Sequence, residues 1–264
     1  ALVAAVGTLL SGRFAAHPWN LIKILRETRQ IRQAYEQLDG ITALTEHVAR
    51  DLRDYFKIRD VPIGVLNNPI IPPDLATLAR APCDHPWLAA DQPSLVLAVG
   101  GLRKVKDFPT LLRAFARLRE VREVRLLILG EGKERRRLER LAMRLGVAGQ
   151  VHLPGFVANP FPYMARSRVL ALTSVREGLG NVLVEAMALG TPVVATECTE
   201  GIRVLLRDGE MGGLVPVGDD QALARALQLA LDSPTDPEML AQLTRPYGRE
   251  AASRAYLDFC AGLP

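Results

Sequence analysis

The chain has few of the features that mark secreted, membrane-spanning or metal-binding proteins. Among its 264 residues are only three cysteines, Cys83, Cys198 and Cys260, which lie far apart and without metal-ligand spacing. We expect them to stay reduced in a cytosolic protein. No run is apolar and long enough to span a bilayer, and no signal-peptide pattern is present. The sequence therefore predicts a cytoplasmic protein.

Aromatic residues are also scarce, at 5% of the chain. This matters because residues 101–150 hold 14 Lys and Arg against 6 Asp and Glu, although the whole chain is only +4. Single-stranded nucleic acid is disfavoured, since its bases need aromatic side chains to stack on. Much of the excess falls on an expected helix, 133–145, with an apolar stripe of Leu138, Leu141 and Leu145. We interpret its arginines as a solvated helix face and expect no nucleic-acid partner.

An initiator methionine is missing as well. The chain opens inside an apparent strand, Ala1 to Val6. We expect a fragment that lacks the start of its first domain.

What the sequence does contain is a regular alternation of strand and helix signals. Short apolar runs of buried-strand type alternate with amphipathic helical stretches, which predicts an α/β fold with parallel sheets and right-handed crossovers. A stiff segment with Pro69, Pro72 and Pro73 separates two parts of the chain. Ligands of such folds bind at the carboxyl ends of the strands. The expected strands begin at residues 41, 61, 94, 124, 151, 169, 193 and 214.

The chemistry of the chain is concentrated at residues 177–190. An apolar run, Val169 to Thr173, precedes a loop containing Gly178 and Gly180. A helix should open near Asn181, a good N-cap, and end at Gly190. A helix N-terminus after a glycine-containing loop holds phosphate on its N–H groups and dipole, here at Asn181 and Val182.

Two carboxylates frame that helix start: Glu177 in the loop and Glu185 about one turn into the helix. A carboxylate beside a pyrophosphate needs neutral donors, and sugar hydroxyls are such donors. The pattern indicates a nucleotide-sugar site with one glutamate for each sugar. On spacing alone, two unrelated glutamates on a surface and a helix face explain it equally well.

The whole stretch resembles the E-x7-E signature of the family-4 retaining glycosyltransferases. The resemblance runs from about Thr42 to the C-terminus, with the motifs in family order. It implies a GT-B fold of two Rossmann-like domains with parallel sheets, the first incomplete. Residues 1–73 would be the end of the N-terminal acceptor domain and the linker. Residues 74–247 would be the donor-binding domain, and 248–264 a helix returning toward the first domain.

The resemblance also assigns roles to individual residues. In the family, the loop at 100–107 reads Gly-Arg-Leu, three variable residues and Lys. Lys106 matches that Lys, Gly101 stands at the Arg position, and Arg103 is a nearby substitute. The catalytic candidates are Glu177, Lys106 and Arg103, and the loop Thr199–Arg203 resembles one near the donor sugar. The donor-binding candidates are Gly101, Gly130, Gly132, Phe156, Val157, Gly178, Leu179, Gly180, Asn181, Val182 and Glu185.

The implied activity is retaining transfer of a sugar from a UDP- or GDP-linked donor to a glycan, lipid-linked or small-molecule acceptor, in envelope polysaccharide or glycoconjugate biosynthesis. No Asp-x-Asp motif is present, so we expect a metal-independent enzyme without a cofactor. Family membership also allows peripheral association with the inner face of the membrane.

Two alternatives stay open. One is a GT-B nucleotide-sugar 2-epimerase, which needs acid/base residues from the first domain. The other is a non-catalytic nucleotide-sugar-binding module, favoured by Gly101 and by Gly7-Thr8 standing where the family commonly has a His. We interpret all four histidines, at positions 17, 47, 85 and 152, as ordinary surface or helix-end residues.

Overall fold

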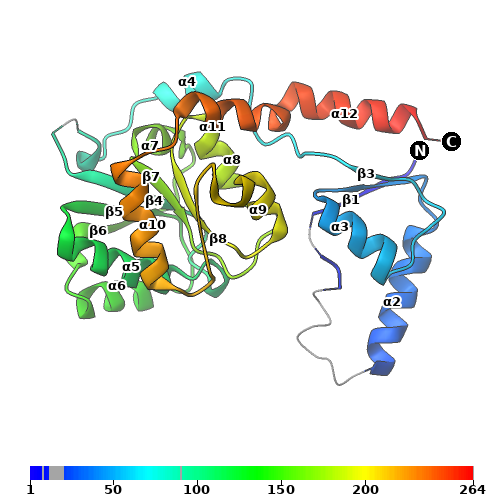
Figure 1. Ribbon diagram of the computed structural model, residues 1–264, viewed down its shortest axis with the longest axis horizontal. Coiled ribbons are helices and arrows are strands. Elements are labelled where there is room, and N and C mark those ends of the chain that lie inside the picture. The colour runs from blue at the N-terminus through cyan, green and yellow to red at the C-terminus, as the bar shows by residue number, and fades with distance from the viewer. Residues whose placement is uncertain (8, 12–20, 90, 264) are drawn as a thin grey trace. The chain divides into compact units, whose positions relative to one another are not determined.

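The computed structural model describes residues 1–7, 9–11, 21–89 and 91–263, which form two compact units (Figure 1). Unit 1 consists of Ala1–Pro69 and Pro246–Pro264, and unit 2 of Ile70–Arg245. His17 and the predicted helix start at Pro18 lie outside the described residues.

Unit 1 is built on a small parallel sheet in the order β1-β2-β3. Apolar residues of β2 and of the turns after it form its core, including Ile41, Leu52, Phe56 and Ile58. Thr45 caps the helix after β2 as predicted, because its hydroxyl accepts from the Val48 N–H. The elements are β1 (Val3–Val6), α2 (Leu21–Tyr35), β2 (Gly40–Ala43), α3 (Glu46–Arg50), a π-helix (Asp51–Tyr55) and β3 (Ile63–Val65).

The C-terminal helix α12 (Arg249–Ala261) belongs to unit 1, although it follows unit 2 in the chain. Two glycines of the sheet explain how it fits. A Cβ added to Gly64 would lie 2.7 Å from the Phe259 ring, and one added to Gly40 would lie 2.8 Å from Leu263. Side chains at these positions would displace the C-terminal segment.

Unit 2 contains a six-stranded parallel sheet in the order β6-β5-β4-β7-β8-β9. The predicted α/β class with parallel sheets is therefore confirmed. The chain adds β5 and β6 on one side of β4 and then β7 to β9 on the other. The strands are β4 (Ser94–Val99), β5 (Val124–Leu129), β6 (Val151–Gly155), β7 (Val169–Leu172), β8 (Val193–Thr196) and β9 (Gly213–Val215).

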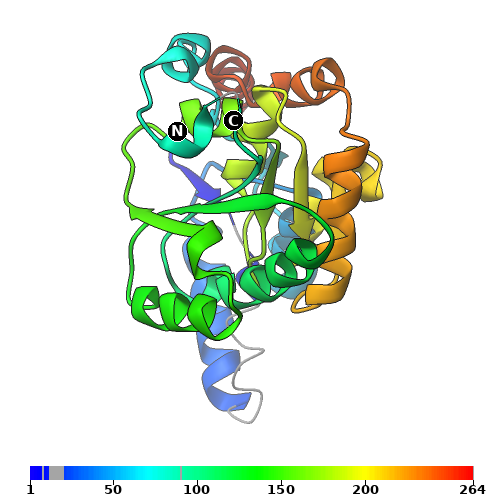
Figure 2. The ribbon, with the colours of Figure 1, turned by 90° about the vertical axis from the view of Figure 1, so that its left-hand side faces the viewer.

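Helices cover both faces of this sheet, because its strands are apolar on both faces. Alternate strand residues, such as Val96 and Ala98, pack with α5, α6 and α10 in one core cluster. Helices α7 and α8 contact the strands separately from that cluster. Figure 2 shows α10, in orange, alongside the strands. The helices are α4 (Leu75–Arg80), α5 (Phe108–Val121), α6 (Arg135–Arg144), α7 (Phe161–Arg166), α8 (Asn181–Ala188), α9 (Glu200–Leu205), α10 (Asp220–Asp232) and α11 (Pro237–Thr244).

Two local predictions were wrong. The N-cap of α8 is Gly180, in the left-handed conformation at φ 79°, and Asn181 is the first helical residue. A left-handed turn suits glycine, which has no Cβ to clash. The segment predicted as a loop from Thr199 to Arg203 is mostly the helix α9, capped by Thr199. The predicted end of α8 is confirmed, since Gly190 adopts φ 74° directly after the C-cap.

Candidate active site

The two loops that carry the catalytic candidates leave the sheet at the point where its strand order reverses. Strands β4 and β7 are neighbours, although β5 and β6 separate them in the chain. The loops that leave their carboxyl ends, 100–107 and 173–180, therefore start side by side. Such a switch point is where open α/β sheets bind their ligands.

An ion pair joins these two loops. The Lys106 ammonium donates to Glu177 Oε1 at 2.5 Å, and both side chains are about one-fifth exposed. Lys106 ends a 3₁₀ turn, and its stem passes over Gly100, where an added Cβ would lie 3.1 Å from the lysine Cε. The two catalytic candidates thus lie in contact, 71 residues apart in sequence.

Backbone and hydroxyl contacts hold the same two loops together. The Thr173 hydroxyl donates to the Lys106 carbonyl at 2.8 Å, and the Val175 N–H donates to the Val105 carbonyl at 2.8 Å. The Ser174 hydroxyl donates to Glu177 Oε1 at 2.7 Å. Sequence reasoning did not include Thr173 or Ser174 in the site. The available signal was the Thr-Ser pair directly after a buried strand.

The start of α8 follows Glu177 in the same loop. Gly180 packs closely, since an added Cβ would lie 3.1 Å from Leu172. Leu179 is buried at 4% exposure, so its side chain belongs to the core and only its backbone can meet a ligand. The N–H groups of the first turn, at Asn181 and Val182, precede the first intrahelical hydrogen bond and suit an anion.

Glu185 lies on α8 with its side chain partly buried. Burial raises the pKa of its carboxyl above the usual value. Among the residues that the structure describes, no donor pairs with this carboxylate. A carboxylate so placed is costly to ionise unless a ligand supplies donors.

The loop Gly130–Gly132 packs closely against the loop after β4, and this packing requires a glycine at both positions. A Cβ added to Gly130 would lie 2.0 Å from the Gly100 carbonyl oxygen, and one added to Gly132 would lie 2.4 Å from the Leu102 carbonyl oxygen. Their suggested role was approach to a ligand. Close contact between the two loops already accounts for them.

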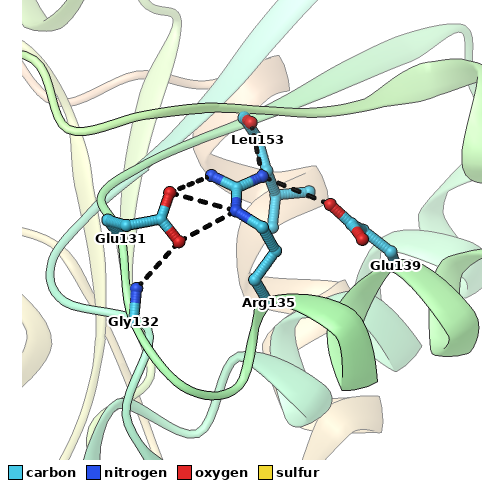
Figure 3. Close-up of polar contacts among 5 residues, drawn as sticks. All are labelled: Glu131, Gly132, Arg135, Glu139 and Leu153. Carbon is cyan, nitrogen blue, oxygen red and sulfur yellow. Dashed lines mark hydrogen bonds and ion pairs between the residues drawn. The ribbon is translucent and has the colours of Figure 1, made fainter.

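Glu131, between these glycines, is held by Arg135 (Figure 3). The guanidinium binds both carboxylate oxygens and also donates to the Leu153 carbonyl on β6 at 2.9 Å. The hydrogen bonds from Arg135 lower the pKa of Glu131 to about 2. The Arg135 guanidinium thus links the loop Gly130–Gly132 to β6 and keeps Glu131 ionised.

Arg103 lies in the same loop as Lys106, next to the loop that holds Glu131 and Gly132. Its exposed side chain lines a hollow of about 570 Å³ together with Lys104, Lys133 and Glu134. Within the described part of the chain it makes no ion pair with Glu177. Gly101 has room for a side chain, since an added Cβ would be 3.4 Å from the Arg103 Nε.

Phe156 and Val157 follow β6, which is one of the two edge strands of this sheet. The Phe156 ring is 79% exposed, so it is free to contact a ligand rather than serving the core. The chain turns into this segment at Gly155, which adopts φ 100°.

A second polar cluster was missed by the sequence interpretation. His85 Nε2 and His152 Nδ1 are 2.8 Å apart, and His85 Nδ1 accepts from the Trp87 N–H at 3.2 Å. The Arg125 guanidinium lies 5.0 Å from the centre of the Trp87 ring. These two histidines are therefore a coupled pair rather than ordinary surface residues.

No group of three or more His, Cys, Asp or Glu side chains within residues 1–7, 9–11, 21–89 and 91–263 is arranged to hold a metal ion. Over the same residues, no helix combines the length and apolarity needed to cross a bilayer.

Comparison with known protein families gives a consistent match. The family model described as "Glycosyl transferases group 1" matches residues 84–247. The lipopolysaccharide core biosynthesis glycosyltransferase LpsE of Rhizobium meliloti is 35% identical over 235 residues, covering 87% of this chain and 66% of LpsE. A Campylobacter jejuni diphospho-undecaprenol 4-alpha-N-acetylgalactosaminyltransferase is 33% identical, covering 84% of this chain and 56% of that protein. The chain thus spans less than two thirds of the length of either relative.

Solved structures share the fold. Anabaena Alr3699/HepE in complex with UDP matches with a TM-score of 0.80 and 21% identity, covering 99% of this chain and 72% of that one. Sucrose-phosphate synthase from Thermosynechococcus elongatus matches with a TM-score of 0.75 and 23% identity, covering 98% and 68%. These likenesses confirm the predicted GT-B fold class.

Proposed function

Since the chain belongs to the group 1 glycosyltransferases, we propose that its protein transfers a sugar from a nucleotide-sugar to an acceptor with retention at the anomeric carbon. The observation that carries the proposal is the Lys106–Glu177 pair at the switch point of the sheet, directly before the N-terminus of α8. There a cation, a carboxylate and backbone donors meet, as a diphosphate joined to a sugar requires.

The diphosphate leaving group gains negative charge as its bond to the sugar breaks. In the proposal, Lys106 and the N–H groups at Asn181 and Val182 stabilise that charge. A lysine ammonium suits this task because it is a compact cation with three donors on a flexible stem. Arg103 contributes only if its exposed side chain turns from the hollow that it lines toward the diphosphate.

The two glutamates have separate roles in the proposal. Glu177 orients the donor sugar, and Glu185 accepts from the ribose hydroxyls. The raised pKa of Glu185 and its lack of a donor among the described residues support this role. A vicinal diol supplies the two donors that a partly buried carboxylate needs.

Residues 70–245 serve as the donor-binding domain in this proposal, and residues 1–69 with 246–264 as part of the acceptor domain. Phe156 and Val157 contact the base, UDP being the first donor nucleotide to test because HepE was solved with UDP. The acceptor is a glycan or lipid-linked glycan of the cell envelope, in line with the names of the two curated relatives. The free thiols of Cys83, Cys198 and Cys260 suit the reducing cytoplasm.

Separating the products formed from a UDP-sugar tests the class of reaction. Transfer to an acceptor or slow hydrolysis, with the anomeric configuration kept, is expected. Epimerised donor would support the 2-epimerase, and donor binding without any turnover would support a non-catalytic module. The curated relatives are named as glycosyltransferases, which favours transfer. EDTA should leave turnover unchanged. Loss that a divalent ion restores would overturn metal independence.

Kinetics of the two glutamate variants test the site. Glu185→Ala should mainly raise the donor KM, because ribose contacts are alike in the ground and transition states. Glu177→Ala should lower kcat by about 100-fold, roughly what misplacing a reacting group costs. Glu177→Gln should fall between. The reverse pattern would exchange the two roles, and no effect from either variant would remove the enzyme assignment.

A further inference from the structure

The two carboxylate oxygens of Glu177 have different surroundings. Oε1 accepts from the Lys106 ammonium at 2.5 Å and from the Ser174 hydroxyl at 2.7 Å. For Oε2, no donor is found among the described residues. The side chain is 18% exposed, so it still reaches solvent. One oxygen is therefore held by the protein, and the other is left to accept from a ligand.

The donors of Oε1 differ in how firmly they are placed. Ser174 is fully buried, and its carbonyl accepts from the hydroxyl of Thr196, also fully buried, at 2.6 Å. Its neighbour Thr173 is 1% exposed and donates to the Lys106 carbonyl. Ser174 therefore has a fixed backbone and a short side chain. Lys106 has the same firm backbone contact but carries its charge on a stem with four rotatable bonds.

Binding of the nucleotide-sugar will act differently on the two hydrogen bonds that Oε1 accepts. A diphosphate competes with Glu177 for the ammonium, because phosphate oxygens accept strongly from a lysine. The Ser174 hydroxyl is on a short, fully buried side chain with a held backbone, so we expect it to keep its hydrogen bond to Oε1. After Lys106 has turned to the diphosphate, Ser174 is the donor that still fixes Oε1.

We infer that Ser174 is a positioning residue that acts through Glu177. It fixes Oε1 so that Oε2 faces the donor sugar throughout the reaction. The inference rests on the proposed function and adds a residue that the family resemblance did not assign. Its consequence is a kinetic one: without the Ser174 hydroxyl, the donor still binds, but Glu177 loses its orientation once Lys106 engages the diphosphate.

The test uses Ser174→Ala in the full-length enzyme with a UDP-sugar that the wild type turns over. We expect kcat to fall about tenfold or more, as a misplaced reacting group costs at least that much. The donor KM and the affinity for UDP should change less than about twofold, because binding contacts remain. Ser174→Thr keeps the hydroxyl and should restore most of kcat. Ser174→Cys keeps the volume but donates weakly, so it should behave like Ser174→Ala and replaces it if that variant fails to fold.

Ser167→Ala is the matched control. Ser167 is also buried, at 8% exposure, and its hydroxyl donates to the Tyr163 carbonyl at 2.5 Å, in α7 and away from Glu177. Removing the Ser167 hydroxyl should lower Tm as much as removing the Ser174 hydroxyl does, but it should leave kcat unchanged.

An unchanged kcat in Ser174→Ala would overturn the inference, as would an equal fall in Ser167→Ala. A Ser174→Thr variant with the Tm of wild type but a kcat as low as that of Ser174→Ala would overturn it too. If Glu177→Ala is impaired and Ser174→Ala is not, the inference fails while the proposed function stands. If the wild type turns over no donor, the proposed function fails and the inference falls with it.

Discussion

The Lys106 ammonium and the Glu177 carboxylate form a 2.5 Å ion pair between the loops after β4 and β7. Each therefore neutralises the other before a ligand arrives. A diphosphate next to Glu177 alone would meet a repelling charge, and the pair removes that repulsion. Once a diphosphate binds, its oxygens compete with Glu177 for the three protons of this ammonium.

Lys106→Ala should weaken binding of the nucleoside diphosphate far more than binding of the free nucleoside. Losing one charged hydrogen bond costs about 1.5–3 kcal/mol, and Glu177 is left to repel the diphosphate. Isothermal titration calorimetry with UDP and uridine measures both. Lys104→Ala is the control, because Lys104 is an exposed lysine of the same loop. Equal losses for both ligands would place Lys106 outside the phosphate site.

Glu185→Gln should stabilise the protein at neutral pH and weaken donor binding. The raised pKa of Glu185 means that, above the ordinary value of 4.5, the folded protein keeps a proton that the unfolded chain has lost. The free energy of unfolding therefore falls as pH rises from 4.5 to the raised pKa of Glu185. Above that pKa, the full cost of burying the charged carboxylate is present. Glutamine carries no charge to desolvate, so the Tm of the variant should be higher than that of wild type.

Thermal melts of Glu185→Gln and wild type at pH 7 and at pH 4 measure this effect. The difference in Tm should shrink at pH 4, where the Glu185 carboxyl is mostly protonated in both the folded and the unfolded wild type. The exposed Glu120 supplies a control in Glu120→Gln, which should leave Tm unchanged at either pH. A Glu185→Gln variant that melts lower than wild type at pH 7 would contradict the burial cost, and an unchanged donor KM would remove its ribose role.

Local patterns in the sequence predicted the strands and the order of the motifs well. The run Val124–Leu129 is apolar at every position except Arg125 and is β5, because both faces of the sheet are covered. The same local patterns do not predict contacts between segments that are distant in the sequence. Gly130 and Gly132 were predicted to bind the donor, but not to leave room for the carbonyls of Gly100 and Leu102, which lie where their Cβ atoms would be. The Ser174–Glu177 hydrogen bond depends on a loop conformation that residue types alone do not determine.

Gly130→Ala should destabilise unit 2 severely. Its Cβ would lie 2.0 Å from the Gly100 carbonyl oxygen, a backbone atom, and φ is +146°. The clash and the strained backbone together should cost about 3 kcal/mol or more. Gly149→Ala is the control, since an added Cβ there meets nothing within 4 Å. It should change stability by less than about 1 kcal/mol. Urea unfolding measures both, and equal midpoints would contradict the close loop packing.

The His85–His152 pair should make the protein lose stability in mild acid. Because His85 Nδ1 accepts from the Trp87 N–H, the neutral ring carries its proton on Nε2, which donates to His152 Nδ1. A proton added to His85 Nδ1 sets it against the Trp87 N–H and breaks that hydrogen bond. Burial, His152 and Arg125 together lower the pKa of His85 below its ordinary 6.5. The unfolded chain then binds more protons below pH 6.5, so stability is present above that value and is lost as pH falls from it toward the lowered pKa.

His85→Asn should reduce this loss, because asparagine keeps an acceptor for the Trp87 N–H and does not titrate. The gain over wild type should be below about 1 kcal/mol, since His85 is partly exposed and its interactions are screened. Melting temperatures between pH 7.5 and 5 measure it. His85→Ala separates the two effects: lacking both the cap and the titration, it should melt below His85→Asn by a similar amount at every pH. A wild type whose Tm falls no more steeply below pH 6.5 than that of His85→Asn would show that the pair carries no such acid sensitivity.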